Sequence, residues 1–202
     1  MSEEKLDTRI RREQIAEAAL QLVASQGPGR LSVAAVARRV GLVPSGIYRH
    51  FRSKEEILLA VLDRIEQRLL ANVKAACQAS SDPLECLRDV LMRHIKFIRE
   101  GRALPRIIFS DDYHGNHPKR KEKVLSIVAQ YTGQLTEIVR RGQQQGVIRK
   151  EVDPATVTMM VLGIVVPAGI RWHLSEGGFD VTQHAKRAWE ILRSAIATKK
   201  NK

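Results

Sequence analysis

Residues 32–54, SVAAVARRVGLVPSGIYRHFRSK, decide the fold of this chain. Apolar side chains recur at helical spacing up to Val40. Gly41 predicts the end of this first helix, because glycine tolerates the left-handed conformation found at helix C-termini. Pro44 predicts the start of a second helix, since its fixed φ suits a first helical turn. Two short helices joined by a glycine-containing turn are typical of a helix-turn-helix, which places its second helix in the major groove of DNA.

The second helix of this motif needs an apolar side, and the first needs a cap. We expect Ile47, Tyr48 and Phe51 to form the apolar side, and Ser32 to cap the first helix. Two roles remain open for Tyr48, which are packing beside Phe51 and contact with a DNA phosphate. We favour the phosphate, because a buried tyrosine hydroxyl would still need a hydrogen-bond partner.

Charge around the motif supports DNA binding independently. No Asp or Glu occurs from Ala18 through Lys54, although the chain holds 22 acidic residues, and this window contains six Arg and Lys residues. Most of the affinity of DNA-binding proteins comes from neutralising phosphates, and an acidic side chain would weaken it. The whole chain has a net charge of +12, which also favours polyanionic partners. A solvated basic surface without a partner is the alternative, but the motif and the charge coincide.

The stretch VARRVGLVPSGIYRHFRSKEEIL, residues 36–58, resembles the tetracycline-repressor (TetR) family of bacterial transcriptional regulators. Residues shared with the family pattern are Ala37, Gly41, Tyr48, Phe51 and Lys54. The turn departs from that pattern. A serine or threonine is common where this chain has Val43, and a glycine-threonine pair is common at positions 45 and 46.

The resemblance implies which residues contact DNA. Arg49 is the best candidate for a bidentate contact to guanine, and Tyr48, His50 and Lys54 match positions that hold phosphates. The expected DNA-binding residues are Ser32, Arg39, Val43, Pro44, Ser45, Gly46, Tyr48, Arg49, His50 and Lys54.

The rest of the chain predicts an all-α fold of about nine helices. Aromatic residues make up only 4% of the chain, and β-branched residues nowhere alternate with polar ones for long. Beyond the motif helices, periodic segments bounded by Gly, Pro, Ser or Asp predict helices near 8–26, 53–80, 82–101, 104–118, 119–145, 153–170 and 180–196. We expect a DNA-binding domain over 8–54, with three helices, and a ligand-binding and dimerisation domain over 55–202.

Residues 157–167, VTMMVLGIVVP, are apolar on nearly every side, so the helix that carries them should be buried all round. The run is shorter than the about 20 residues of a membrane span, and Pro167 and Arg171 argue further against one. The resemblance implies a homodimer through the last two long helices. We therefore expect a helix at a dimer interface, and no membrane contact.

Several side chains of the expected body could line a ligand pocket. The resemblance implies a small-molecule effector, and the aromatic candidates favour an apolar or aromatic one. The expected ligand-binding residues are His94, Phe97, Phe109, Tyr131 and Trp172, although ordinary core packing explains His94 better and the other four at least as well.

Two smaller features carry weaker hypotheses. A metal site at Asp111, Asp112, His114 and His117 is less favoured than an exposed loop or the lip of a pocket, because the spacing is loose and no further ligand completes it. Cys77 and Cys86 bracket a turn between helices. A redox switch there would need a neighbour that favours thiolate, and none is visible in the sequence.

The sequence contains no catalytic motif, phosphate-binding glycine loop or metalloprotease motif, so we expect no enzyme, metal or cofactor. Residues 1–12 are polar and charged, which predicts no secretory signal and a cytoplasmic protein. We expect a homodimeric regulator, acting as a repressor, on an inverted repeat of double-stranded DNA. Two alternatives remain: a protein that coats DNA without sequence preference, and an adaptor whose DNA-binding head is vestigial.

Overall fold

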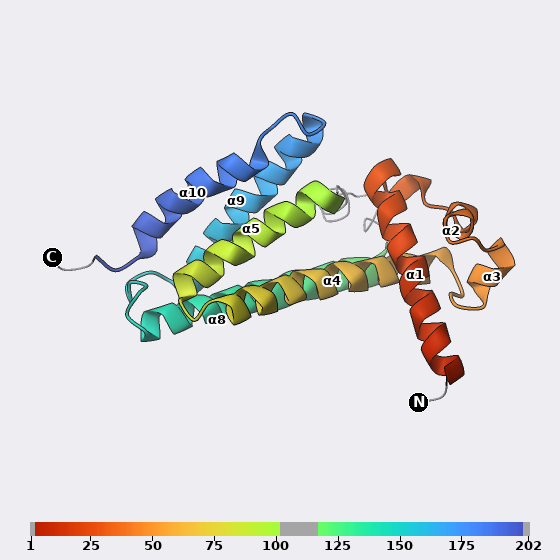
Figure 1. Cartoon of the computed structure of the whole chain (residues 1–202), viewed down its shortest axis with the longest axis horizontal. Helices are drawn as coiled ribbons and strands as arrows, with labels where there is room; N and C mark the ends of the chain where they lie inside the picture. Colours follow the sequence, from red (N-terminus) through yellow and green to blue (C-terminus); the bar gives the residue numbers. More distant parts are fainter. Residues whose placement is uncertain (1–2, 102–116, 200–202) are drawn as a thin grey trace. The chain divides into compact units, whose positions relative to one another are not determined.

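The computed structural model describes residues 3–101 and 117–199, and eight α-helices lie within them (Figure 1). The only β-pairing in these residues is an isolated bridge between Ile148 and Ala197. This confirms the all-α prediction, and the ninth expected helix, near 104–118, falls almost entirely outside the described residues. The elements are α1 (Glu3–Gln26), the 3-10 turn η1 (Pro28–Arg30), α2 (Val33–Arg39), α3 (Pro44–Tyr48), α4 (Lys54–Ala79), α5 (Pro83–Gly101), α8 (Pro118–Gln144), α9 (Pro154–Leu174) and α10 (Val181–Ile196).

The chain divides into two compact units. The first, called the head unit here, comprises residues 1–67 and 101–126, and the second, the body unit, comprises 68–100 and 127–202. The boundary between the units falls inside α4 and inside α8, so each of these long helices contributes turns to both units. The domain boundary expected between residues 54 and 55 stays a prediction.

The head unit is organised around α1. Side chains from α1, α2 and α3 meet in one apolar cluster with exposed fractions of 0 or 1%, formed by Ile15, Ala19, Val23, Val36, Ala37, Ile47 and Phe51. Ser32 caps α2 by accepting a hydrogen bond from Ala35 N–H at 3.1 Å, as expected. Gly41 has a φ of +69°, a left-handed conformation that glycine adopts without strain, and there the chain turns toward α3.

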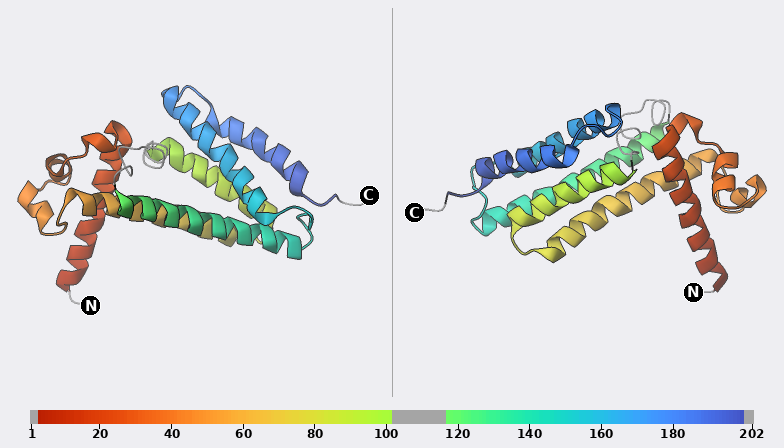
Figure 2. Two further views of the ribbon diagram at one scale, coloured as in Figure 1. Left: turned by 180° about the vertical axis from the view of Figure 1, so that it is seen from behind. Right: turned by 45° about the horizontal axis from the view of Figure 1, so that its top comes forward.

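Within the head unit, ion pairs join the first half of α4 to the start of α8. Arg120 Nε lies 3.0 Å from Glu55 Oε1, although the arginine side chain is only 4% exposed. Lys123 Nζ contacts both Asp63 at 2.8 Å and Glu66 at 2.6 Å. The order of these contacts shows that the two helices run alongside each other in the same direction, which is visible in Figures 1 and 2.

The body unit contains α5, the later turns of α4 and α8, and the pair formed by α9 and α10, which lie side by side in Figures 1 and 2. Both helices of this pair begin at the aspartates that the sequence indicated. Asp153 accepts from Thr156 N–H at 2.7 Å, and Asp180 accepts from Gln183 N–H at 2.9 Å. The buried side of α10 consists of the expected Ala185, Trp189, Leu192 and Ile196, together with Val181.

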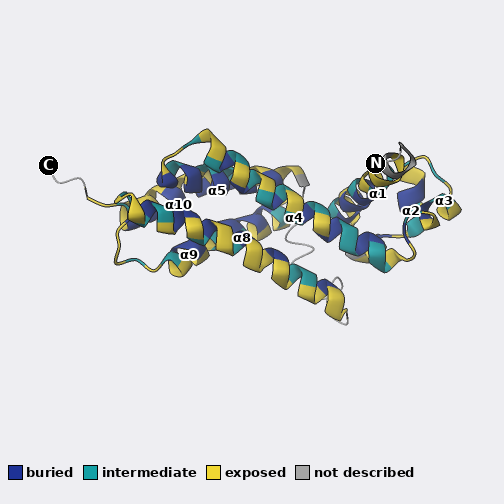
Figure 3. Ribbon diagram, turned by 90° about the horizontal axis from the view of Figure 1, so that it is seen from below, coloured by how far each residue is buried: buried dark blue, intermediate teal, exposed yellow. Residues whose placement is uncertain are grey.

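Helix α9 is buried on one face in the single chain, so its burial on all sides at a dimer interface stays a prediction. One face is buried, by Val157, Val161, Val165 and other residues, but the opposite face is open, with Met159 62% and Leu174 77% exposed. Figure 3 shows buried and exposed positions alternating along this helix. In the single chain the helix is therefore not buried on all sides.

The length argument against a membrane span was wrong for α9, because the helix extends well beyond the apolar run. Among the described residues, α9 is the one helix long and apolar enough to cross a membrane. Its buried face belongs to the helical core of the body unit, however, and Thr158 on that face is hydrogen-bonded to Thr136 of α8 at 3.1 Å. A core helix of a bundle satisfies the same criteria of length and composition.

Helix α8 has the expected bounds but a narrower buried face. The sequence places Val128, Tyr131, Leu135 and Ile138 at helical spacing, and Tyr131, Leu135 and Ile138 are buried, whereas Val128 is 39% exposed. Val128 lies one turn before Thr132, whose hydroxyl donates to the Val128 carbonyl, and this side of α8 faces outward.

Two glycines of α8 give opposite predictions for substitution by alanine. At Gly142 a Cβ would lie 2.5 Å from Ile148 Cδ1 and 3.2 Å from Pro83 Cβ, whereas at Gly133 nothing lies within 4 Å. Gly142→Ala should lower the free energy of unfolding by about 1–3 kcal/mol through overpacking. Gly133→Ala should raise it by up to about 1 kcal/mol, since alanine favours helix.

Urea denaturation followed by circular dichroism measures both changes. Equal effects of the two substitutions would contradict the packing of α8 against Ile148.

Candidate functional site

The exposed surface of the helix-turn-helix carries the residues expected to contact DNA. Eight of the ten are exposed, and Gly46 and His50 are half-buried. Val43 is 65% exposed and occupies the N-cap of α3, where its side chain makes no capping hydrogen bond. A serine or threonine, which is common at this position in the family that the sequence resembles, could cap the helix through its hydroxyl oxygen. Valine cannot, because its side chain has no hydrogen-bond acceptor.

Tyr48 corrects the expected buried side of α3. The tyrosine is 55% exposed, whereas Ile47 and Phe51 are 0% and 1% exposed. Residues 47 and 51 lie four apart and share the inner face of this short helical segment, and residue 48 points away from it. The phenol is therefore free of the core, which removes the packing alternative.

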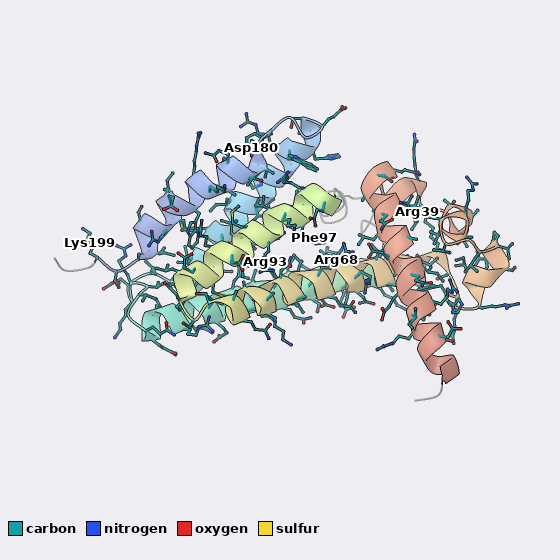
Figure 4. The ribbon with its side chains drawn as sticks, in the orientation of Figure 1. Arg39, Arg68, Arg93, Phe97, Asp180 and Lys199 are labelled. Carbon is teal, nitrogen blue, oxygen red and sulfur yellow. The ribbon has the colours of Figure 1, made fainter. Side chains whose placement is uncertain are left out.

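Arg49 and Lys54 also project from this surface. Both are exposed, and neither side chain makes a hydrogen bond or ion pair with another described residue. Arg39 differs, because its Nε and Nη2 donate to Gln21 Oε1 at 3.2 and 2.9 Å, which fixes its guanidinium beside α1 (Figure 4).

Only part of the His50 imidazole is available for a phosphate. Its Nδ1 is buried and has no hydrogen-bond partner among the described residues, and its backbone carbonyl accepts from Arg12 Nη1. Any contact of the imidazole with a phosphate therefore falls to Nε2.

The corner between α3 and α4 contains a contact that sequence reasoning missed. Arg12 of α1 donates to Glu56 at 2.8 Å, and its guanidinium carbon lies 4.1 Å from the centre of the Phe51 ring. Glu56 also accepts from Arg52 N–H at 2.8 Å, and Ser53 Oγ accepts from Glu56 N–H at 3.2 Å. The Arg52 N–H and the Arg12 guanidinium hold the pKa of the Glu56 carboxyl below its usual value. Arg12 lies 44 positions before Glu56 in the chain, so helical periodicity cannot reveal this pair.

This corner borders a hollow of about 420 Å³ on the head unit. Its lining includes Arg12, Tyr48, Arg49 and Arg52, with Glu56 as its only acidic side chain. Because Glu56 is occupied by Arg12 and the Arg52 backbone, the other cationic groups of this surface keep their charge available for an anion.

In the body unit, the structure brings together two of the five residues expected to bind a ligand. His94 of α5 and Tyr131 of α8 are buried, and His94 Nδ1 lies 3.0 Å from the Tyr131 hydroxyl oxygen. Their rings meet edge to face at a centroid distance of 5.4 Å. Burial lowers the pKa of His94 to about 4 and raises that of Tyr131, so both groups are neutral at pH 7.

The remaining ligand candidates lie elsewhere. Phe97 is buried on α5 beside Arg68, whose guanidinium carbon is 5.7 Å from the ring centre, and Figure 4 shows both side chains. Trp172 of α9 borders a hollow of about 750 Å³ with the charged residues Lys96 and Arg99. Phe109 lies outside the described residues.

The proposed metal cluster cannot be placed as a group. Asp111, Asp112 and His114 lie outside the described residues. His117 is described, and its Nδ1 lies 3.8 Å from Glu55 in a contact that is ionic only when the imidazole is protonated. Within the described residues no three His, Cys, Asp or Glu side chains are grouped to hold a metal ion.

Comparison with known proteins matches two family models. Residues 15–61 match the model described as bacterial regulatory proteins, tetR family, and residues 80–196 match the tetracyclin repressor-like C-terminal domain. The nucleoid occlusion factor SlmA of Vibrio atlanticus (strain LGP32) is 25% identical over 187 residues, which cover 92% of this chain and 95% of that protein.

Solved structures of similar fold include two with nearly complete coverage. A TetR transcriptional regulator from Chloroflexus aurantiacus is 18% identical, with a TM-score of 0.81 over 96% of this chain and 99% of that one. The regulator FadR from Bacillus subtilis in complex with stearoyl-CoA is 22% identical, with a TM-score of 0.77 over 91% and 98%. At these identities the structures support the fold.

The uncapped start of α3 predicts a stabilising substitution. Val43 has φ −84° and ψ 155°, which suits an N-cap residue. Val43→Thr should raise the free energy of unfolding by about 1 kcal/mol, because the hydroxyl can accept an unpaired N–H of the first turn. Val43→Ala serves as the control that shortens the side chain without adding a cap. Urea denaturation measures both, and a threonine variant no more stable than the alanine variant would refute the capping role.

Buried His94 predicts a pH dependence of stability. Its pKa is lowered from 6.5 to about 4 in the folded chain, so the unfolded chain binds a proton more readily between these values. The free energy of unfolding should therefore be unaffected by His94 above pH 6.5. It should fall by on the order of 3 kcal/mol as the pH is lowered toward 4.

His94→Gln should flatten this part of the pH profile, since glutamine can hydrogen-bond to Tyr131 but does not titrate. His184→Gln, at an exposed position, is the matched control. Chemical denaturation at a series of pH values measures the slope, and an unchanged slope in His94→Gln would contradict the assignment.

Proposed function

The chain belongs to the tetR family of bacterial regulatory proteins, and from this premise we propose that two copies repress transcription by binding an inverted-repeat operator. The chain is a DNA-binding transcriptional regulator with a ligand-binding body, and not an enzyme. A small molecule in the body would release the dimer from DNA. Because such a regulator acts on chromosomal DNA, we place it in the cytoplasm.

The observation that carries this proposal is the surface of the helix-turn-helix. Tyr48, Arg49 and Lys54 are exposed there, and the sequence around them is free of acidic residues from Ala18 to Lys54. A surface with donors and cations but no competing carboxylate fits a phosphate backbone. The Arg12–Glu56 contact supports it by holding the corner where α3 ends and α4 begins.

We assign different roles to the exposed residues. Arg49 has a guanidinium that no described residue engages, and it is suited to a bidentate contact with guanine. Val43 presents an apolar side chain to the same groove and would contact a thymine methyl group. The groups left for the phosphates are Ser32, Arg39, Tyr48, His50 through Nε2, and Lys54. Pro44, Ser45 and Gly46 form the first turn of α3 and would lie closest to the bases.

The dimer is proposed from the open apolar face of α9 and from Ile191, an exposed apolar side chain of α10. Met159 is 62% exposed on α9, and Ile191 is 73% exposed on α10. A second copy that covers these faces would complete the burial that the apolar sequence of α9 requires. Two symmetric heads would then contact successive major grooves about 34–36 Å apart, which explains an inverted repeat.

For the effector we propose an apolar small molecule that binds the body unit. The buried neutral pair His94–Tyr131 would supply the polar contact of an otherwise apolar site. The similar regulator from Bacillus subtilis is in complex with stearoyl-CoA, so a long-chain acyl-CoA is the first ligand to test. An effector releases DNA only if it binds the DNA-incompetent conformation more tightly.

Selection of binding sites from random duplex DNA tests the proposal, followed by affinity measurements at two salt concentrations and light scattering of the free protein. An enriched inverted repeat bound by a dimer supports it. Salt-dependent binding without an enriched sequence would instead indicate a coating protein. Binding to no DNA would favour the adaptor.

Substitutions in the head should separate base contacts from phosphate contacts. Arg49→Ala should cost about 1–3 kcal/mol on the selected operator and relax specificity at one base pair. Tyr48→Phe and Lys54→Ala should weaken binding to specific and random DNA alike, since phosphates carry no sequence information. Fluorescence anisotropy on both DNAs measures these changes. Equal losses for Arg49→Ala on the two DNAs would refute its role in base recognition.

A further inference from the structure

The two cysteines of the chain lie together in the body unit. Cys77 is in the last turn of α4 and half-buried, whereas Cys86 is in the first turn of α5 and completely buried. Both are free thiols. The turn of residues 80–82 reverses the chain between them, which places the end of one helix against the start of the next.

Arg141 of α8 supplies the cation that the sequence did not reveal. Its Nη2 lies 3.8 Å from Cys77 Sγ, and its Nε is buried without a hydrogen-bond partner among the described residues. The guanidinium therefore places a positive charge and a hydrogen-bond donor beside the sulfur of the half-buried cysteine. The arginine is 64 positions away from Cys77 in the sequence, so only the packing of α8 against α4 brings it there.

The same place is open to small molecules. Cys77 borders a hollow of about 470 Å³, together with Lys74, Arg140 and Arg141. The cationic side chains outnumber the one carboxylate in its lining, Glu137, which is itself ion-paired with Arg140. A peroxide can therefore reach Cys77, whereas Cys86 is shielded from solvent.

The two thiols differ in a way that assigns their order of reaction. Burial, followed by a hydrogen bond with the Cys77 thiol, raises the pKa of Cys86 to about 12. Cys86 thus stays protonated and unreactive toward external oxidants, but it is in contact with Cys77. This arrangement of an accessible thiol beside a cation and a second thiol in reach is typical of redox-sensing cysteines.

We propose that Cys77 reacts with hydroperoxides and that Cys86 resolves the product as an intrachain disulfide between α4 and α5. The Cys77 thiolate attacks one peroxide oxygen and becomes a sulfenic acid, while the other oxygen leaves as hydroxide and takes up a proton. The Cys86 sulfur then attacks the sulfenic sulfur, the S–O bond breaks, and the Cys86 proton leaves with the hydroxyl group as water. One peroxide is reduced, and two thiols are oxidised. The step involves only the body unit and does not rest on the proposed function.

Intact mass spectrometry and alkylation of the full chain, before and after treatment with hydrogen peroxide, test the proposal. The expected result is loss of both free thiols within one chain, reversed by a dithiol reductant. Cys86→Ser should stop at a sulfenic acid that dimedone traps, and Cys77→Ser should leave Cys86 reduced. A bond between two chains, or unreacted thiols in the parent at millimolar peroxide, would overturn it.

The role of Arg141 is tested by the rate of the first step. Arg141→Gln should slow oxidation of Cys77 several-fold, because it removes the positive charge that lies 3.8 Å from the attacking sulfur. Arg141→Lys should restore most of the rate, because it keeps the charge. Arg187→Gln removes the same charge at an exposed position of α10 that does not line the hollow. This variant should leave the rate unchanged. Equal rates for Arg141→Gln and the parent would refute the cationic activation, provided circular dichroism shows both folded.

Discussion

The contact between Arg12 and Glu56 is the constraint on which the DNA-binding surface depends. Helix α3 has five residues, and a helix this short is not stable without tertiary support. Its support comes from Ile47 and Phe51 in the apolar cluster and from the corner that follows, where Glu56 joins Arg12, the Arg52 backbone and the start of α4. Since the carboxylate accepts from both the Arg12 guanidinium and the Arg52 N–H, one side chain beyond the motif ties the end of α3 to α1.

A second constraint comes from the composition of α9. An apolar surface on every side of a helix cannot be covered by one neighbouring layer, and the body unit covers only one face of it. Met159 and Leu174 therefore stay exposed on the face that the chain itself does not cover. The same sequence pattern that would place a helix in a membrane is, in this arrangement, divided between a core and a surface.

The buried polar groups of the body unit show how such groups are accommodated in an apolar interior. His94 and Tyr131 are neutral and satisfy each other, since a buried charge without a partner would be costly. Cys77 and Arg141 retain a polar contact at the edge of a hollow, where the charge is partly hydrated. One pair is thus neutral and enclosed by the core, whereas the other places a cation beside a thiol that borders a hollow.

The sequence by itself determined the all-α class, the helix-turn-helix and nearly all helix boundaries, because helical periodicity, caps and the glycine of the turn are local signals. Ser32, Asp153 and Asp180 act as caps where the sequence indicated. Only the tertiary structure decided the exposure of Tyr48, the open face of α9, and the partners Arg12–Glu56, His94–Tyr131 and Cys77–Arg141. These contacts join residues far apart in the chain, and periodicity within one helix cannot specify which distant side chain faces it. Local patterns therefore define the elements, and packing defines the chemistry of the sites.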